Sequence, residues 1–595
     1  MSSAALVGKD GSIDWCCLPR FDSASVFAAI LDRDGGSFRI APADSEASSS
    51  QSYLPDTNVL CTRFQTPTGE LSVTDFMPVG KVGGSSQIAP NEIHRVVRCE
   101  SGSVEVVCTF NPRLDYARAD TVLVPFKNGV LARGGGHSVT LAADFDLDVT
   151  PGSAAARFTL AEGGEAVFVM AYGYGRPRRV ASYRSRQQLD VTKAYWKSVV
   201  GQMTYRGLWR EQVTRSFLVL QLMRYRRTGA IIAAPTTSLP EEIGGTRNWD
   251  YRYAWLRDSS FTVDVFHRMG DSDAGVRYVN WLLERCKVNS GKTRIVYGIT
   301  HSSSLKEFTL DHLEGYGGSR PIRVGNRAAG HLQLDVFGEV ILTLHSLHRH
   351  QGWISDEAWS LVANFADVVS RNWHRKDRGM WEVRGKQQHF VYSKVMCWAA
   401  MDRAARIAGA RGENDLATVW RSTADAIRAE VLERGWSDRK QSFVQRYGSD
   451  TLDASVLVIP FLYFLPPGDP RVRLTLEAIS RELADGPFVR RYLPAETDDG
   501  LEGQDEGAFT LLSFWLIGNL ICTGQVERAV EYFEAMLGHA NHVGLFAEMI
   551  NPRTGEFLGN FPQAYSHVGL IHTAQNLSRA LRGMPADDQP VLAAD

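Results

Sequence analysis

The chain is 595 residues long, and its 65 Lys and Arg residues nearly balance 67 Asp and Glu residues, so the formal net charge is −2. A nearly neutral protein lacks the basic surplus with which nucleic acids and anionic membranes are bound, which argues against both as partners. With 44% hydrophobic and 22% charged residues the composition is typical of a globular protein, and the length predicts two or more domains.

No stretch approaches the roughly 18 consecutive apolar residues of a membrane-spanning helix. The opening MSSAALVGKDGSIDW lacks the basic and then apolar layout of a secretory signal. The eight cysteines are sparse and show no Cys-x-x-Cys spacing, so we expect reduced thiols in a cytoplasmic protein. The adjacent Cys16 and Cys17 fit either a redox pair or burial in a strand, and we favour burial.

The first 180 residues have the pattern of short strands. In SVEVVCTF, the side chains of Val104, Val106, Cys108 and Phe110 alternate with their neighbours at a period of two. Similar segments follow one another, separated by Gly, Pro, Asp and Ser. Many short strands with turn signals between them predict an antiparallel β-sandwich over residues 1–180.

The period changes after the basic stretch RPRRVASYRSRQQ, so residues 181–205 are predicted to form a helical linker. Beyond it, apolar residues recur every three or four positions, the period of a helix with one buried face. Three stripes show this period: Trp209, Val213, Phe217 and Leu220; Leu416, Trp420, Ala424, Ile427 and Val431; and Val526, Ala529, Val530, Phe533 and Leu537. Residues 206–583 are therefore predicted to form about a dozen paired helices with long loops at one end, followed by a disordered tail at 584–595.

The loops between these helices combine aromatic and charged residues, the combination that sugars need. Aromatic rings stack on the C–H faces of a sugar, while its hydroxyls need polar partners. In RNWDYRYAWLRDSS, Trp249, Tyr251 and Trp255 would surround a pocket in which Arg257 and Asp258 hold neighbouring hydroxyls. A structural Arg–Asp ion pair beside a Trp-rich core is the alternative, and composition alone favours it.

Cleavage of a glycosidic bond needs two carboxyl groups, one protonated and one acting as base or nucleophile. Glu382 directly follows Trp381. Contact with the aromatic ring would raise the pKa of Glu382, as a general acid requires. The alternative is that Glu382 is an exposed residue at the start of a helix. Glu548 lies in the apolar FAEMI, where a lone acid needs a partner or a role. Arg490 or Arg491 could bind sugar hydroxyls, or belong to a solvated acidic loop.

The sequence offers little for a metal or a phosphate. His345, His348 and His350 lack carboxylate or Cys neighbours, so no metal site is predicted. GYGRPRR has too few glycines at the spacing of a phosphate-binding loop.

Five long blocks, in order and spread over about residues 2–583, resemble the glucoamylase/trehalase family of glycoside hydrolases (family fifteen), in particular its bacterial trehalase-like branch. The blocks are SAALVGKDGSIDWCCLPRFDSASVFAAILD, NWDYRYAWLRDSSFTVD, LEGYGGSRPIRVGNRAAGHLQLDVFGEV, MWEVRG with FVYSK, and LGNFPQAYSHVGLI. The resemblance implies an N-terminal antiparallel β-sandwich followed by an all-α (α/α)6 barrel. The chain begins at MSSAALVG, where relatives usually continue upstream, so either an edge strand is missing or the start codon is misassigned.

The same resemblance assigns roles to individual residues. It implies that Glu382 is the general acid and Glu548 the general base. It implies that Tyr251 helps to hold the attacking water. The substrate-binding residues that it implies are Trp255, Arg257, Asp258, Arg320, Trp381 and Arg491. The loop GLEGQDEGAF carries one acid more than the family pattern, which leaves its contacts to the outer sugar undetermined.

The implied reaction is exo-acting, inverting hydrolysis of an α-glucoside, with α,α-trehalose as the leading substrate. Isomaltose, maltose or short α-glucans are the alternative substrates, because the loops do not fix the site of the second sugar. A disaccharide phosphorylase and a non-catalytic sugar-binding protein are less favoured, since both glutamates are present. We expect no cofactor, a small carbohydrate as the partner, and either a monomer or a homo-oligomer.

Overall fold

The computed structural model describes residues 1–80, 89–288, 293–301, 304–497, 499–500 and 506–583, and the predicted tail lies outside these ranges. The chain divides into two compact units. The N-terminal unit comprises Met1–Gln202 together with two short segments from further along the chain, Tyr225–Arg227 and Leu310–Gly318. The helical unit comprises the remainder of the described chain.

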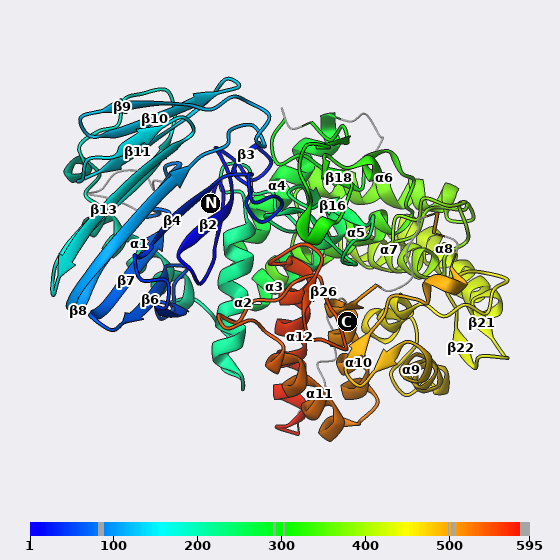
Figure 1. Cartoon of the computed structure of the whole chain (residues 1–595). Coiled ribbons are helices and arrows are strands. Elements are labelled where there is room, and N and C mark those ends of the chain that lie inside the picture. Colours follow the sequence, from blue (N-terminus) through cyan, green and yellow to red (C-terminus); the bar gives the residue numbers. More distant parts are fainter. Residues whose placement is uncertain (81–88, 289–292, 302–303, 498, 501–505, 584–595) are drawn as a thin grey trace. The chain divides into compact units, whose positions relative to one another are not determined.

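The N-terminal unit is built from antiparallel strands (Figure 1). The strands are β1 (Ala5–Val7), β2 (Ser12–Cys17), β3 (Ser25–Phe27), β4 (Ser37–Pro42), β5 (Ser48–Tyr53), β6 (Leu60–Thr66), β7 (Gly69–Phe76), β8 (Glu92–Asn111), β9 (Val122–Phe126), β10 (Gly129–Gly134), β11 (His137–Ala143), β12 (Asp148–Thr150), β13 (Ser153–Ala161) and β14 (Glu165–Tyr172). Helix α1 (Ser185–Gly201) follows them. Cys16 and Cys17 are buried in β2 with free thiols, as expected.

The long strand β8 belongs to two sheets at once. Its first half pairs with β7 and β14, and its second half pairs with β4 and β13. In the second half, Val104, Val106, Cys108 and Phe110 are buried and alternate with more exposed neighbours. The predicted period of two is therefore present, and β8 ties the two sheets of the sandwich together.

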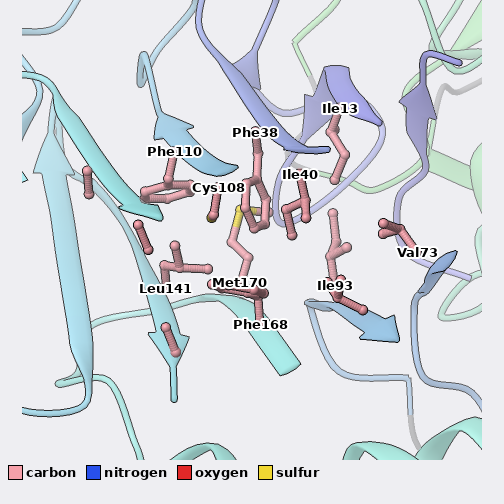
Figure 2. Close-up of a cluster of buried hydrophobic side chains, with 14 of the residues drawn as sticks. Ile13, Phe38, Ile40, Val73, Ile93, Cys108, Phe110, Leu141, Phe168 and Met170 are labelled. Carbon is pink, nitrogen blue, oxygen red and sulfur yellow. The ribbon is translucent and has the colours of Figure 1, made fainter. Parts of the chain in front are cut away.

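The core of this unit lies between the two sheets. Figure 2 shows Phe38 and Ile40 of β4 and Phe110 of β8 facing Leu141 of β11 and Phe168 of β14, all buried. The Phe38 and Phe110 rings meet edge to face at 5.4 Å, the arrangement that aromatic pairs prefer. Apolar burial of this kind is the main force that holds two sheets face to face.

The first half of β8 carries a charge into the interior. Arg95 is fully buried, and its Nε and Nη2 donate to the two carboxylate oxygens of Asp75 on β7, at 2.8 and 3.2 Å. Its remaining bonds go to the backbone carbonyls of Phe38 and Gly11. A buried guanidinium is tolerated only with a counter-ion and satisfied donors, and Arg95 has both.

The later segments of the N-terminal unit are held by hydrogen bonds. The backbone N–H of Arg226 donates to the carbonyl of Met1 at 2.8 Å. An imidazole nitrogen of His312 lies 2.7 Å from the carbonyl oxygen of Tyr116, and the N–H of Glu314 donates to the Asp32 carboxylate at 2.9 Å.

The helical unit is an (α/α)6 barrel (Figure 1). In the described part of the chain, six elements close an inner ring in which each contacts the next: α3 (Leu256–Arg268), α5 (Asp335–Gln351), α7 (Val391–Ala410), two 3-10 turns at Ala454–Val458 and Pro460–Leu462, α10 (Thr510–Cys522) and α12 (Ala564–Ala580). The fourth inner position is thus filled by 3-10 turns instead of an α-helix. Inner elements are covered on all sides, which explains why nearly every residue of α7 and α10 is buried.

The outer helices show the predicted stripes. They are α2 (Arg210–Met223), α4 (Ser272–Val288), α6 (Asp356–Asn372), α8 (Asn414–Arg434), α9 (Pro470–Glu482) and α11 (Val526–Gly538). Val213, Phe217 and Leu220 of α2 are buried, whereas Leu416 of α8 is exposed although the period places it on the buried face. Leu416 lies in the first turn of its helix, where packing against the barrel has not yet begun.

None of the helices in the described ranges combines the length and the apolar character that a bilayer span needs.

Candidate active site

The N-terminal ends of the inner helices meet at a cavity of two adjoining lobes. We call the first the helix-end lobe; it is lined by Ala233, Trp255, Arg257, Asp258, Met380, Phe509, Glu548, Gln563 and Tyr565. We call the second the loop lobe; it is lined by Glu241, Arg247, Trp249, Asn326, Ala328, His331 and Arg384. Tyr251, Trp381, Glu382 and Arg491 line both lobes.

The start of α3 supplies the charged pair of the helix-end lobe. Arg257 and Asp258 lie in its first turn, directly after Trp255, and both are buried. The Arg257 guanidinium donates to Glu382 Oε1 at 3.0 Å and lies 3.6 Å from the Asp335 carboxylate. Burial raises the pKa of Asp258 to about 7, although the neighbouring Arg257 opposes this shift. Asp258 also lies at the positive end of its helix, where a negative charge is favoured.

Glu548 lies just before the short strand β26 (Met549–Ile550) and is buried. Tyr251 donates its hydroxyl proton to Glu548 Oε1 at 2.7 Å, and Oε2 has no hydrogen-bond partner within the described part of the chain. Gly559 makes room for Oε2, since a Cβ at this position would lie 2.4 Å from it. Burial and the nearby charge of Glu241 raise the pKa of Glu548 well above its usual value, and the Tyr251 hydrogen bond opposes this.

Glu382 occupies a turn before α7 that also brings Trp381 into the cavity. Its backbone has a φ of 53°, which is uncommon outside glycine and which the surrounding structure must hold in place. The Trp381 indole N–H is fixed by the Asp453 carboxylate at 3.0 Å, and its ring meets the Phe509 ring at 5.3 Å. The side chain of Glu382 is 23% exposed and lies at the junction of the two lobes.

A network of buried ion pairs underlies the loop lobe. Arg491 donates through Nη2 to Glu241 Oε2 at 2.6 Å and to Glu506 Oε2 at 2.7 Å. Arg247 pairs with Asp499 at 2.8 Å and with Glu506 at 2.9 Å. Burial raises the pKa of Glu241, and Arg491 opposes that shift.

The loop lobe also has an aromatic wall. The guanidinium groups of Arg323 and Arg384 each lie 4.5 Å from the centre of the Trp249 ring. Trp249 belongs to β16 (Asn248–Asp250), which pairs with β15 (Thr237–Pro240), and Glu241 directly follows β15. This small hairpin therefore places both an indole and a carboxylate in the loop lobe.

The structure brings together all but one of the residues expected at the site. Glu382, Glu548, Tyr251, Trp255, Arg257, Asp258, Trp381 and Arg491 line the cavity. Arg320 does not line either lobe and its side chain is exposed. The arginine of that loop that approaches the site is Arg323, through its contact with Trp249.

Several lining residues had no signal in the sequence. Glu241, Arg247, Gln563 and Tyr565 are ordinary residues in their local patterns, and the fold alone brings them to the cavity. Tyr565 and Gln563 lie in a block quoted for the family resemblance, which could have drawn attention to them. In the described ranges, no group of three or more His, Cys, Asp or Glu residues has the arrangement of a metal site.

A cavity at the helix ends of an (α/α)6 barrel, with carboxyl groups, arginines and aromatic rings on its walls, defines a carbohydrate-active enzyme of the glycoside hydrolase class. A model of the family described as "Glycosyl hydrolases family 15" matches residues 207–575. A model of the domain described as "Trehalase-like, N-terminal" matches residues 1–196. The chain belongs to glycosyl hydrolase family 15.

Relatives match the chain over nearly its whole length. A protein named trehalase from Mycolicibacterium smegmatis is 38% identical, over 97% of this chain and 90% of its own. One from Thermoplasma volcanium, also named trehalase, is 36% identical over 97% of this chain and 92% of its own. Among solved structures, a bacterial glucoamylase in complex with acarbose is similar with a TM-score of 0.75, covering 99% of this chain and 96% of that one. At 14% identity this last likeness shows the common fold.

Proposed function

We propose that the protein is a trehalase, which hydrolyses α,α-trehalose to two glucose molecules with inversion at the attacked carbon. The observation that carries the proposal is the distribution of the two carboxyl groups over the cavity. Glu382 lines both lobes, whereas Glu548 lines only the helix-end lobe. An acid that protonates the bridging oxygen belongs between two sugar sites, and a base that activates water belongs beside the sugar that is attacked.

In this mechanism one glucose unit occupies the helix-end lobe, where Arg257 and Asp258 bind its hydroxyls. Protonated Glu382 donates to the bridging oxygen as the bond to the second glucose breaks. The open Oε2 of Glu548 takes a proton from a water that attacks the opposite ring face, while Tyr251 holds Oε1. Inversion requires about 6.5–9.5 Å between the two carboxyl groups, enough to admit this water. The water attacks as the bridging bond breaks, so no covalent sugar–enzyme bond forms.

The relatives named trehalase support this substrate over the alternatives. Proton NMR of the first sugar released from trehalose tests substrate and stereochemistry together. We expect one β-glucose and one α-glucose from each trehalose before mutarotation. Two α-glucose molecules would exclude inversion, and no release from trehalose together with release from isomaltose or maltotriose would replace the proposed substrate. Sugar 1-phosphate formed in phosphate buffer would indicate a phosphorylase.

We also propose a cytoplasmic location. The eight free thiols support it, because disulfides form in oxidising compartments and are rare in the cytoplasm. Fractionation of the producing cells, followed by detection with an antibody, tests this. Recovery with the secreted or membrane fraction would contradict it.

A further inference from the structure

Glu241 and Glu548 hold their carboxylates in the same way. Each is buried, at 1% and 2% exposure, and each has one oxygen engaged and one without a partner among the described residues. In Glu548 the engaged oxygen accepts from Tyr251, and in Glu241 it accepts from Arg491. The unpartnered oxygen of Glu548 has a task in the proposed mechanism, whereas that of Glu241 has none.

A purely structural role for Glu241 leaves this open oxygen unexplained. Arg491 already has a second carboxylate partner in Glu506, which it contacts through both Nε and Nη2. Leaving a buried acceptor without a hydrogen bond lowers stability, and a charged acceptor lowers it more than a neutral one. Such exceptions in a folded protein require an explanation, and a bound group is one of them.

The place of Glu241 indicates what that partner is. Glu241 lines the loop lobe and is absent from the lining of the helix-end lobe. Among the described residues that line the loop lobe, only Glu241 and Glu382 carry a carboxylate, and Arg247, Arg384 and Arg491 supply charged donors. A sugar hydroxyl donates as well as accepts, and Glu382 is assigned to the bridging oxygen. Glu241 is therefore the charged acceptor left for a hydroxyl of the sugar in this lobe.

We propose that Oε1 of Glu241 accepts a hydrogen bond from a hydroxyl of the second glucose, the unit that leaves, and that Glu241 thereby determines specificity for a disaccharide substrate. Arg491 acts as a positioning residue that fixes the carboxylate through Oε2. This inference rests on the proposed function, in which the loop lobe holds the leaving sugar.

The variant Glu241→Gln tests the proposal with two substrates. The amide oxygen would stay with Arg491, so an NH2 donor would replace the open acceptor. Trehalose carries the second sugar, whereas α-glucosyl fluoride places a glucose in the helix-end lobe and has no second sugar. We expect kcat/KM of Glu241→Gln to fall about 10- to 100-fold more on trehalose than on α-glucosyl fluoride, relative to the native enzyme. Glu242→Gln, one residue away and outside both lobes, is the matched control and should change this ratio less than twofold.

Rates are compared at the pH plateau of each variant, because removing the charge of Glu241 lowers the pKa of Glu548 and moves the acid limb for both substrates. Equal losses on both substrates would overturn the proposal, since they would place Glu241 in the chemical step or in the fold. No loss on either would overturn it too. If Glu241→Gln does not fold, judged by its thermal transition, Glu241→Asp withdraws the carboxylate from the lobe and must give the same substrate-dependent ratio. If the native enzyme cleaves isomaltose but not trehalose, the proposed function fails, and the same ratio measured on isomaltose still decides the role of Glu241.

Discussion

At the residue scale, Glu382 and Glu548 have different surroundings, and these surroundings suit the two carboxyl groups to different roles. Glu548 is enclosed, and its hydroxyl partner Tyr251 leaves one oxygen open beside Gly559. Glu382 is partly exposed, lies in a strained turn and faces both lobes. The first environment suits a group that works on one water, and the second suits a group that meets a bond between two sugars.

Substitution of the two acids by amides should separate their roles. We expect Glu548→Gln to lower kcat about 10²- to 10⁴-fold on both trehalose and α-glucosyl fluoride, because water must be activated in either case. Glu382→Gln should lose a similar factor on trehalose but far less on the fluoride, whose leaving group needs little protonation. The exposed Glu556→Gln is the control for a glutamate of the same block and should retain full activity. Full glucose release by either amide variant would refute the assignment.

The pH dependence should report the state of Glu548. A general base works ionised, so activity is present above the pKa of Glu548 and is lost as the pH falls through it. The hydroxyl of Tyr251 lowers that pKa. In Tyr251→Phe the acid limb of kcat/KM should therefore move to higher pH, with a plateau rate reduced by about tenfold. An unmoved or acid-shifted limb would show that another group controls it.

At the scale of the element, β8 shows how one strand serves two sheets while carrying a buried charge. Its second half follows the simple alternation of buried and exposed side chains. Residues 93–97 of its first half are buried on both faces, and there Arg95 is neutralised by Asp75 of the neighbouring strand. The pair fixes the register of β7 against β8, because a slip of one residue would separate the charges.

Breaking this pair should destabilise the N-terminal unit. Asp75→Asn leaves the Arg95 charge buried without a counter-ion, and we expect the free energy of unfolding to fall by about 3–5 kcal/mol. Glu105 lies further along β8 and forms an exposed ion pair with Arg157 of β13. Glu105→Gln breaks that pair and should lower the free energy of unfolding by at most about 1 kcal/mol. Denaturant unfolding followed by circular dichroism measures both. Equal effects of the two substitutions would mean that burial does not decide the contribution of the Arg95 pair.

At the scale of the whole molecule, hydrophobic periodicity in the sequence predicts those helices and strands that have one buried and one solvated face. The alternation at 104–110 and the stripes of α8 and α11 are visible in the sequence because one face of each element is solvated. Inner elements such as α10 carry no such contrast, and the sequence does not show that the fourth inner position is filled by 3-10 turns. From the sequence alone, an arginine at position 95 would be expected at the surface. Only the tertiary structure brings Asp75 beside it and so allows its burial.

For the candidate site, too, local sequence patterns predicted only part of what the structure contains. Periodicity and composition indicated a sugar site with two acids, but the choice of Glu382 and Glu548 came from the family resemblance. Glu241 had no local signal, because its partner Arg491 and its neighbour Glu548 lie far along the chain. Arg320 was expected from its place in a family block, yet its exposed side chain lies outside both lobes.

The N-terminal unit incorporates Tyr225–Arg227 and Leu310–Gly318, which are made only after the first segments of the helical unit, Met203–Arg224 and Thr228–Thr309 respectively. On the ribosome, this unit is therefore incomplete when Gln202 emerges, and it waits for residue 318 before its last hydrogen bonds can form. Assembly of the two units is thus interleaved in time, and a gene fragment cut at their apparent border encodes a fragment with unmet contacts.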